Sequence, residues 1–270
     1  MTAEEALRAG RPDEALKLLQ QRVRESPADA PLRVFLFQLL CVQGQWNRAL
    51  TQLNVAGELD AGTLLMVQTY REALRCEVYR ADVFAGVRTP MVLGQPEEWF
   101  ALLLQSLALS AQKHDEQAAQ LRSRALELAP AAPGRLNGKA FEWLADGDCR
   151  IGPCLELILN ARYYWVPLTQ IRTLRLEPPA DLRDLVWMPA ELTWANGGQA
   201  VALIPSRYPG SESAEAALQL SRRTDWQEAA DGMYVGSGQR AFITDDGSET
   251  ALFDVREIGF EPTGTQEPAA

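Results

Sequence analysis

The sequence predicts an α+β protein with helical repeats in its first half and a mainly antiparallel β domain, with one or two helices, in its second half. Three observations predict this order. A motif recurs after 34 residues near the N-terminus, apolar residues keep helical spacing beyond it, and short β-prone runs separated by turn residues follow a linker. We therefore expect a helical domain at 1–135, a β-rich domain at 141–260 and a flexible tail at 261–270.

The repeat is visible as two copies of one turn. Residues 10–16 match residues 44–50 at an offset of 34 residues, which is the tetratricopeptide period. The glycine that opens each copy, Gly10 or Gly44, is expected to end a helix in a left-handed turn. The alanine that follows is small enough for paired helices to approach closely. The first half therefore predicts a tetratricopeptide-like array, with a generic helical bundle as the alternative.

A later unit shows the same spacing between its alanine and the proline after its second helix. Ala118 precedes Pro130 by 12 residues, as Ala15 precedes Pro27. The unit before it is degenerate, because its turn lacks the glycine. Helical spacing nevertheless continues, and we expect helices near residues 2–9, 12–25, 29–43, 46–56, 61–84, 96–111 and 114–129, with a loop between 84 and 96.

Turn residues between β-prone runs predict hairpins in the second half. Asn196-Gly197-Gly198 is a strong signal, because its central positions tolerate positive φ. Residues 214–223 read as a helix. A small twisted barrel or a bent sheet is expected. The predicted hairpins join residues 155–159 to 163–166, 191–194 to 199–204, and 241–244 to 250–255.

Charge and hydropathy exclude two classes of partner. Residues 1–140 hold 16 acidic and 16 basic residues, whereas residues 141–270 hold 20 acidic and 10 basic residues and carry the whole net charge of −10. Phosphate would be repelled by this half, so we expect no nucleic-acid partner. The N-terminus lacks the pattern of a secretory signal, and the most apolar run, 99–109, is too short to span a bilayer. We expect a cytoplasmic protein with no membrane partner.

The residues that catalysis, metal binding or cofactor binding would need are missing. His114 is the single histidine, and no GxSxG or GxxxxGK[ST] motif is present. The glycine-rich segment 232–240 precedes a predicted strand rather than a helix, so it does not fit dinucleotide binding. We predict no catalytic residue, no metal and no cofactor, and therefore a protein that is not an enzyme. The four cysteines form no CxxC pair and are expected to be free buried thiols: Cys41, Cys76, Cys149 and Cys154.

Three carboxylates near the start of the β domain are a weaker candidate site. Asp146, Asp148 and Glu156 could act as an acid–base group only if they converged in a pocket. They flank a turn and the start of a strand, and Arg150 lies between them. A salt bridge with Arg150 is the favoured interpretation.

Aromatic and arginine residues of the second half are candidates for binding a partner. In a strand, Tyr163 and Trp165 share one face, and aromatic side chains are common interface anchors, although core on both faces is the alternative. The loops at 207–211 and 236–240 are polar and could form a recognition surface, although a structural turn with an ion pair fits as well. The predicted partner-binding residues are Tyr163, Trp165, Arg207, Tyr208, Gln239 and Arg240.

Five phrases of the second half resemble a known family when they are taken together and in order. They are DCRIGPCLE at 148–156, NARYYWVP at 160–167, EPPADLRDLVW at 177–187, IPSRYPG at 204–210 and VGSGQR at 235–240. The family is ImpE, also called TagJ, whose members are accessory proteins of bacterial type VI secretion. The resemblance covers about 141–260, and the helical half fits the tetratricopeptide-like part of the family.

The resemblance implies a cytoplasmic accessory factor with no catalytic residues. Its implied partner is the small subunit of the contractile sheath, bound through an N-terminal helix of that subunit, with a functional link to the ATPase that recycles contracted sheath. The leading hypothesis is therefore an adaptor whose repeat groove binds a sheath segment and aids sheath turnover. The alternative is a small-ligand-binding protein or an enzyme, in which the loops at 207–211 and 236–240 converge in one pocket.

Overall fold

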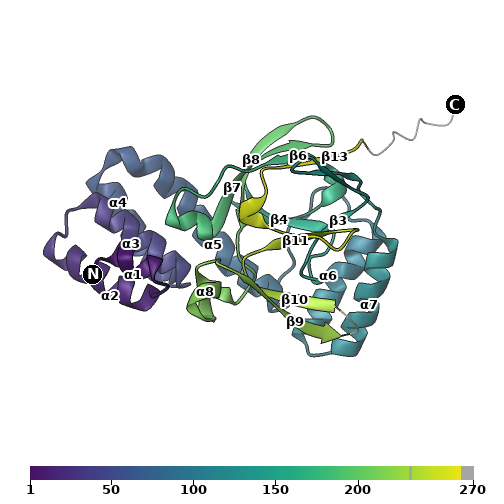
Figure 1. Ribbon diagram of the computed structural model, residues 1–270, viewed down its shortest axis with the longest axis horizontal. Coiled ribbons are helices and arrows are strands. Elements are labelled where there is room, and N and C mark those ends of the chain that lie inside the picture. Colours follow the sequence, from purple (N-terminus) through teal and green to yellow (C-terminus); the bar gives the residue numbers. More distant parts are fainter. Residues whose placement is uncertain (231–232, 263–270) are drawn as a thin grey trace.

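The helical first half lies beside a strand-rich second half in the computed structural model, which describes residues 1–230 and 233–262 (Figure 1). Every predicted helix of the first half is present, with ends within three residues of the prediction. A one-turn 3-10 helix, η1 (Ala61–Thr63), precedes the fifth helix. The helices are α1 (Ala3–Arg8), α2 (Pro12–Glu25), α3 (Ala30–Val42), α4 (Trp46–Leu59), α5 (Leu64–Phe84), α6 (Glu98–Ala111) and α7 (Asp115–Leu128).

The turn that joins paired helices is the same in three places. Gly10 and Gly44 have φ values of 72° and 65°, as the left-handed turn requires. Lys113 stands at the equivalent position between α6 and α7 with φ of 61°. In each turn a backbone N–H donates to the carbonyl five residues earlier, from Arg11 to Ala6, from Gln45 to Leu40 and from His114 to Leu109. The later unit therefore keeps the turn geometry without the glycine.

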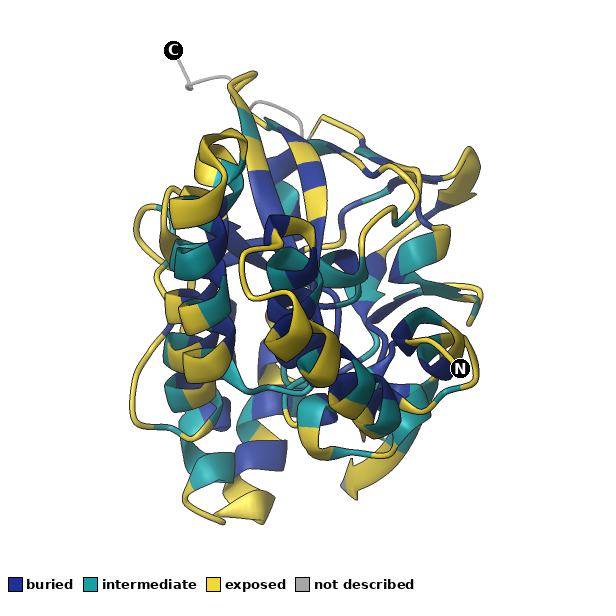
Figure 2. Cartoon of the chain, turned by 90° about the vertical axis from the view of Figure 1, so that its left-hand side faces the viewer, coloured by how far each residue is buried: buried dark blue, intermediate teal, exposed yellow. Residues whose placement is uncertain are grey.

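Small and large apolar side chains fill the seams between these helices. Ala15, Ala49 and Ala118 are buried, as are Leu19 and Leu53. The helices α3 and α4 pack side by side, and so do α6 and α7. In Figure 2 the helices carry buried residues on some turns and exposed residues on others, as expected for amphipathic helices. The predicted helical-repeat architecture is confirmed.

The second half is antiparallel, as predicted. Its largest sheet has the strand order β2-β1-β13-β6-β7-β8-β4-β5, and two smaller sheets have the orders β12-β11-β3 and β10-β9. The large sheet has two edges, so of the two expected forms the barrel is wrong and the sheet is open. The strands are β1 (Gly134–Leu136), β2 (Lys139–Phe141), β3 (Leu144–Asp146), β4 (Cys154–Leu159), β5 (Arg162–Pro167), β6 (Ile171–Arg175), β7 (Trp187–Trp194), β8 (Gln199–Pro205), β9 (Thr224–Ala230), β10 (Met233–Gly238), β11 (Ala241–Thr244), β12 (Glu249–Ala251) and β13 (Glu257–Phe260).

All three predicted hairpins are present, as β4–β5, β7–β8 and β11–β12. Asn160 and Ala161 connect β4 to β5 and both have positive φ, which suits the twist of a two-residue hairpin loop. The free edge of β5 is covered by the predicted loop after α5. Met91 donates to the Tyr163 carbonyl at 3.1 Å and accepts from the Trp165 N–H at 3.0 Å.

The predicted helix at 214–223 is mostly absent. Only α8 (Ala216–Gln219) forms there, after the 3-10 helix η4 (Ser211–Ser213). Ser221 adopts a left-handed φ of 53°, and the Arg222 N–H turns back to the Ala217 carbonyl. These two features end the helix after one turn. Three further 3-10 turns connect strands: η2 (Leu168–Gln170), η3 (Leu182–Leu185) and η5 (Leu252–Asp254).

The apolar core crosses the predicted domain boundary. One cluster of buried residues includes Leu39 and Leu74 from the helices together with Trp165 and Trp187 from the sheet. A second cluster lies within the β half. The helices and the sheet are thus packed on one another, and the boundary between 1–135 and 141–260 stays a prediction. Residues 263–270 of the predicted tail lie outside the described residues.

Candidate functional site

Arg80 of α5 is the centre of a buried group of charges between the helices and the sheet. Its Nε and Nη2 atoms donate to the two carboxylate oxygens of Glu156 on β4, at 2.6 and 3.0 Å, and Nη2 also donates to the Arg207 carbonyl at 2.8 Å. Glu77 lies one turn earlier and accepts from Trp187 Nε1 at 2.9 Å. Bidentate arginine–carboxylate pairs are strong and directional. This pair therefore fixes α5 against β4.

Arg240 extends the group to the three-stranded sheet. It donates to Glu156 and to Asp146 through its two Nη atoms. Tyr208 Oη lies 2.9 Å from Asp146 Oδ1, and the Tyr163 hydroxyl donates to Glu156. All the charged side chains involved are at most 7% exposed. We call the following residues the ionic cluster: Glu77, Arg80, Asp146, Glu156 and Arg240.

The electrostatics of the ionic cluster hold one carboxylate firmly ionised. Burial raises the pKa of Glu156, but Arg80 and Arg240 outweigh it and bring the pKa to about 2. Burial raises the pKa of Asp146 to about 6, although the charge of Arg240 opposes this. An acid–base catalyst must reach the proton that it transfers, and these groups are enclosed and bonded to one another. The cluster is a structural connection rather than a reaction centre.

The favoured interpretation of Asp148 and Arg150 is confirmed. Arg150 Nε and Nη2 donate to the two carboxylate oxygens of Asp148, at 2.9 and 2.6 Å. Asp148 also accepts from the Gly236 N–H at 3.0 Å. The carboxylate thus joins the turn after β3 to β10. The other two carboxylates of that candidate site, Asp146 and Glu156, belong to the ionic cluster.

The loops at 207–211 and 236–240 converge, but they pack as core. Arg207 and Gln239 form a β-bridge, and the Tyr208 N–H donates to the Gly238 carbonyl at 2.9 Å. Arg207 Nη1 also reaches across to the helices, where it donates to the Val42 carbonyl at 2.7 Å. The space between the loops is filled by their own side chains. A ligand pocket between them, on which the enzyme alternative depended, is not supported.

The six residues predicted to bind a partner are all buried, which corrects the expectation of an exposed recognition surface. Their polar atoms bond within the chain, as when Gln239 Oε1 accepts from the Phe253 N–H at 3.2 Å. One sequence feature indicates that these polar side chains bond within the chain. Glu156 is an acidic residue inside the apolar run of β4, and a buried carboxylate needs a partner. The buried residues are Tyr163, Trp165, Arg207, Tyr208, Gln239 and Arg240.

The inner face of the helical array is covered by the same chain, so this face is not the open groove that the repeat predicted. The ring of Trp187 lies 6.0 Å from Trp46 and 5.7 Å from Tyr70. Arg183 of η3 stacks 4.8 Å above the Tyr70 ring, and Arg222 donates to the Leu7 carbonyl at 2.6 Å. The second half therefore occupies the face that repeat arrays commonly offer to peptides.

An apolar groove lies at the other end of the helical part, where the α6–α7 hairpin and the linker meet β3 and β10 (Figure 1). Its volume is about 410 Å³. Trp143 and Tyr234 at its border are 40% and 45% exposed, which is unusual for such large side chains. We call it the apolar groove, and it is lined by Trp99, Leu126, residues 129–132, residues 143–147, Cys149, Gly152, Pro153, Leu168, Thr169, Met233, Tyr234 and Ile243.

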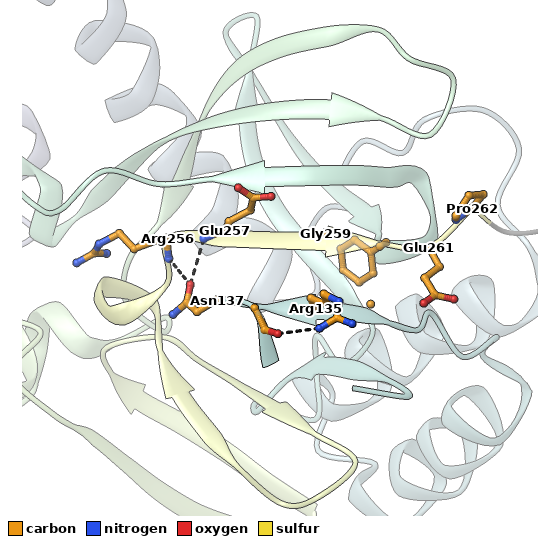
Figure 3. Close-up of a pocket in the computed structure, with 10 residues that line it drawn as sticks. Arg135, Asn137, Arg256, Glu257, Gly259, Glu261 and Pro262 are labelled. Atoms are coloured by element: carbon orange, nitrogen blue, oxygen red, sulfur yellow. Dashed lines mark hydrogen bonds between the residues drawn. The ribbon is translucent and has the colours of Figure 1, made fainter. Parts of the chain in front are cut away.

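A second hollow, of about 810 Å³, follows β1 and β13 (Figure 3). Its polar groups already bond to one another. Asn137 Oδ1 accepts from the backbone N–H groups of Arg256 and Glu257, at 2.8 and 3.1 Å, and Arg135 donates to the Gly138 carbonyl at 3.0 Å. Because these groups are satisfied within the chain, the apolar groove is the better candidate for a binding site.

Thiols and acidic residues do not add a reactive site in the described part of the chain. The four cysteines are free and buried, as predicted, and burial raises the pKa of each thiol, so they are poor nucleophiles. Among residues 1–230 and 233–262, no group of three or more His, Cys, Asp or Glu side chains is placed to hold a metal ion. Within the same ranges, every helix is too short or too polar to cross a membrane.

The fold and the site define a class of protein: a tetratricopeptide-like array joined to an antiparallel β half by buried charges, with an apolar groove beside the α6–α7 hairpin. Residues 138–259 match the family described as ImpE protein, and residues 6–68 match a tetratricopeptide repeat family. A type VI secretion system accessory component, TagJ of Pseudomonas aeruginosa, is 58% identical over 264 residues, which cover 97% of this chain and 92% of that protein. The chain therefore belongs to the ImpE family, also called TagJ.

A solved structure agrees with the whole fold. The crystal structure of a Vibrio parahaemolyticus protein superposes with a TM-score of 0.87 at 28% sequence identity. The match covers 96% of this chain and 97% of that one. The packing of the helices against the sheet is thus part of an arrangement that a relative shares across its full length.

Proposed function

We propose that this chain is an accessory protein of type VI secretion that acts as an adaptor for the contractile sheath. In this proposal it binds the small sheath subunit through that subunit's N-terminal helix, and it thereby aids turnover of the sheath by the recycling ATPase. Membership of the family supports the secretion system, since the Pseudomonas aeruginosa relative is described as an accessory component of it. The sheath subunit and the ATPase come from the resemblance of the five phrases.

The apolar groove is the observation that carries the binding. An amphipathic helix binds by placing its apolar face in a groove, with large side chains as anchors. The groove offers Trp143 and Tyr234 to such a helix and has room for several apolar side chains. The inner face of the helical array is a poorer candidate, because Trp187 and Arg183 already cover it.

The observations favour binding over catalysis. The ionic cluster is enclosed. The loops at 207–211 and 236–240 converge, but they pack against each other as core and leave no pocket between them. Catalysis needs groups that reach a substrate, and the apolar groove is lined mainly by carbon. No observation favours a second function.

Binding is tested with the full-length chain and the purified small sheath subunit. Co-purification and calorimetry are expected to give a stable complex with the intact subunit. A subunit that lacks its N-terminal helix is expected to give no heat of binding. The proposal is overturned if the intact subunit does not bind, or if removal of its helix leaves the affinity unchanged.

A further inference from the structure

Arg122 of α7 is a buried cation with no carboxylate partner in the described part of the chain. Arg122 is only 3% exposed. Nη2 donates to the Ser110 hydroxyl at 2.8 Å, but Nε is enclosed without any hydrogen-bond partner. Arg80 and Arg240, by contrast, share Glu156. A buried charge is costly unless it is paired, so the position of Arg122 requires an explanation.

Arg122 lies directly behind the wall of the apolar groove. Cys149 lines the groove, and the Arg122 charge lies near enough to oppose the rise that burial causes in the pKa of the Cys149 thiol. Leu126, one turn later on α7, lines the groove as well. Arg122 itself is not part of the lining, so its guanidinium lies behind a wall that is mainly apolar and includes the carboxylate of Asp146.

We propose that the apolar groove takes an amphipathic helical segment that carries one carboxylate, and that Arg122 pairs with this carboxylate. The guanidinium group binds carboxylates in a planar fork, and it does so most strongly where water is excluded. The second half has 20 acidic and 10 basic residues beyond residue 140, so most of its surface repels acidic partners. A cation behind an apolar wall selects a carboxylate that enters together with apolar side chains.

This inference rests on the proposed function, because the sheath helix is the occupant to which it commits. In the free chain, Arg122 is a buried charge that stays unpaired until the partner binds. Replacing such a charge by an apolar side chain of similar length is often neutral or stabilising. Arg122→Met is therefore expected to weaken binding while the urea midpoint of the free chain stays the same or rises. A residue with a purely structural role would show the opposite pattern.

The probe is a synthetic peptide of the small sheath subunit's N-terminal helix, titrated into the full-length chain by calorimetry. A series of peptides replaces each Asp by Asn or each Glu by Gln, one at a time. Arg122→Met is expected to weaken binding by about thirtyfold or more, as for the loss of one partner of a buried charge pair. The matched control is Arg124→Gln, an exposed arginine of the same helix, which is expected to leave the affinity unchanged.

The peptide series identifies the partner of Arg122. One amide peptide should weaken binding to the wild-type chain by a similar factor, and it should cause no further loss with Arg122→Met. The Arg122 inference alone is overturned if Arg122→Met leaves the affinity unchanged, or if every amide peptide binds the wild-type chain as well as the parent does. A wild-type chain that binds neither the parent peptide nor the intact subunit overturns the proposed function as well. If Arg122→Met lowers both the urea midpoint and the affinity, the peptide series decides between the two roles.

Discussion

The ionic cluster and the apolar groove lie next to each other and share Asp146, yet they are built in opposite ways. The charged groups of the cluster are enclosed and bonded to one another across the two halves of the chain. The groove is lined mainly by apolar side chains, and Trp143 and Tyr234 at its border remain partly exposed. Groups whose bonding is complete within the chain hold the fold, whereas groups left incomplete are available to a partner.

This difference changes the interpretation of the most distinctive residues in the sequence. The phrases that resemble the ImpE family contain Glu156, Arg207 and Arg240. The structure uses Glu156 and Arg207 to join the helices to the second half, and Arg240 to join two of the sheets to each other. The groove draws partly on residues outside the phrases, such as Trp143 and Leu126, and partly on Cys149, Gly152 and Pro153 of the phrase at 148–156. A family-specific phrase can therefore encode a fold-specific contact rather than a binding surface.

The largest expected effect comes from removing the charge that two arginines share. Glu156→Gln leaves Arg80 and Arg240 buried with too few carboxylates, and breaking such a pair costs about 3 to 5 kcal/mol. Urea unfolding followed by circular dichroism measures the change. The control is Glu72→Gln on α5, whose ion pair with Arg75 is largely exposed and is expected to contribute less than about 1 kcal/mol. A loss below about 1 kcal/mol for Glu156→Gln would show that the cluster is not what joins the two halves.

Glu156 and Asp146 should affect the pH dependence of stability in opposite directions. The pKa of Glu156 is lowered from 4.5 to about 2, so its stabilisation is complete above pH 4.5 and is lost as the pH falls from there. The difference corresponds to about 3 kcal/mol. The pKa of Asp146 is raised from 3.8 to about 6, so its ionisation destabilises the fold, and the effect is relieved as the pH falls through 6.

Because the two contributions to the free energy of unfolding oppose each other, these two groups together give a stability maximum at about pH 4 to 5. Urea midpoints measured at intervals from pH 7 to pH 3 reveal it. Glu156→Gln is expected to remove the fall of the urea midpoint below about pH 4.5. Asp146→Asn is expected to remove the rise of the midpoint as the pH is lowered through about 6. A wild-type midpoint that rises steadily from pH 5 to pH 3 would contradict the assignment.

Substitution in the groove should separate binding from stability. Trp143 is partly exposed, so Trp143→Ser is expected to change the free energy of unfolding by less than about 1 kcal/mol. Affinity for the sheath helix is expected to fall by about tenfold or more, because exposed aromatic residues are the usual anchors of such interfaces. Leu65→Ser is the control, since Leu65 is 81% exposed but lies on α5. Equal affinities for both variants would place the binding surface elsewhere.

Local patterns predicted the helices of the first half and the three hairpins, but they did not predict β1, β2, β3, β9, β10 or β13. Gly10 and Gly44 mark turns whose geometry depends on a few neighbouring residues, and the hairpin at Asn196-Gly197-Gly198 is equally local. The helix expected at 214–223 failed for a local reason that composition does not reveal, because Ser221 adopts a left-handed conformation that serine seldom takes.

The site could not be predicted in the same way, because its contacts join distant parts of the sequence. Arg80 and Glu156 are separated by 76 residues, and Arg207 and Val42 by 165. The apolar groove combines side chains from α6, α7, the linker, several strands and the turn at 149–153, and no local pattern shows that these segments meet. The sequence pointed toward the ionic cluster only through Glu156, which lies within an apolar run, and through its grouping with Asp146 as a candidate pair of carboxylates.

The smallest expected effect concerns the turn between α6 and α7, at the end of this hairpin away from Trp99 and Leu126 of the groove. Lys113 adopts a left-handed φ of 61° between α6 and α7, where the two equivalent turns have glycine. A side chain in this conformation costs about 1 to 2 kcal/mol, and the greater freedom of glycine in the unfolded chain offsets part of that cost. Lys113→Gly is therefore expected to stabilise the chain by about 0.5 kcal/mol, measured as a higher urea midpoint. Gly44→Ala is the matched control and should destabilise, since its Cβ would also lie within 3 Å of Glu212. Because Lys113 lies outside the groove lining, the affinity for the sheath helix should not change, and a change would show that the α6–α7 turn sets the shape of the groove.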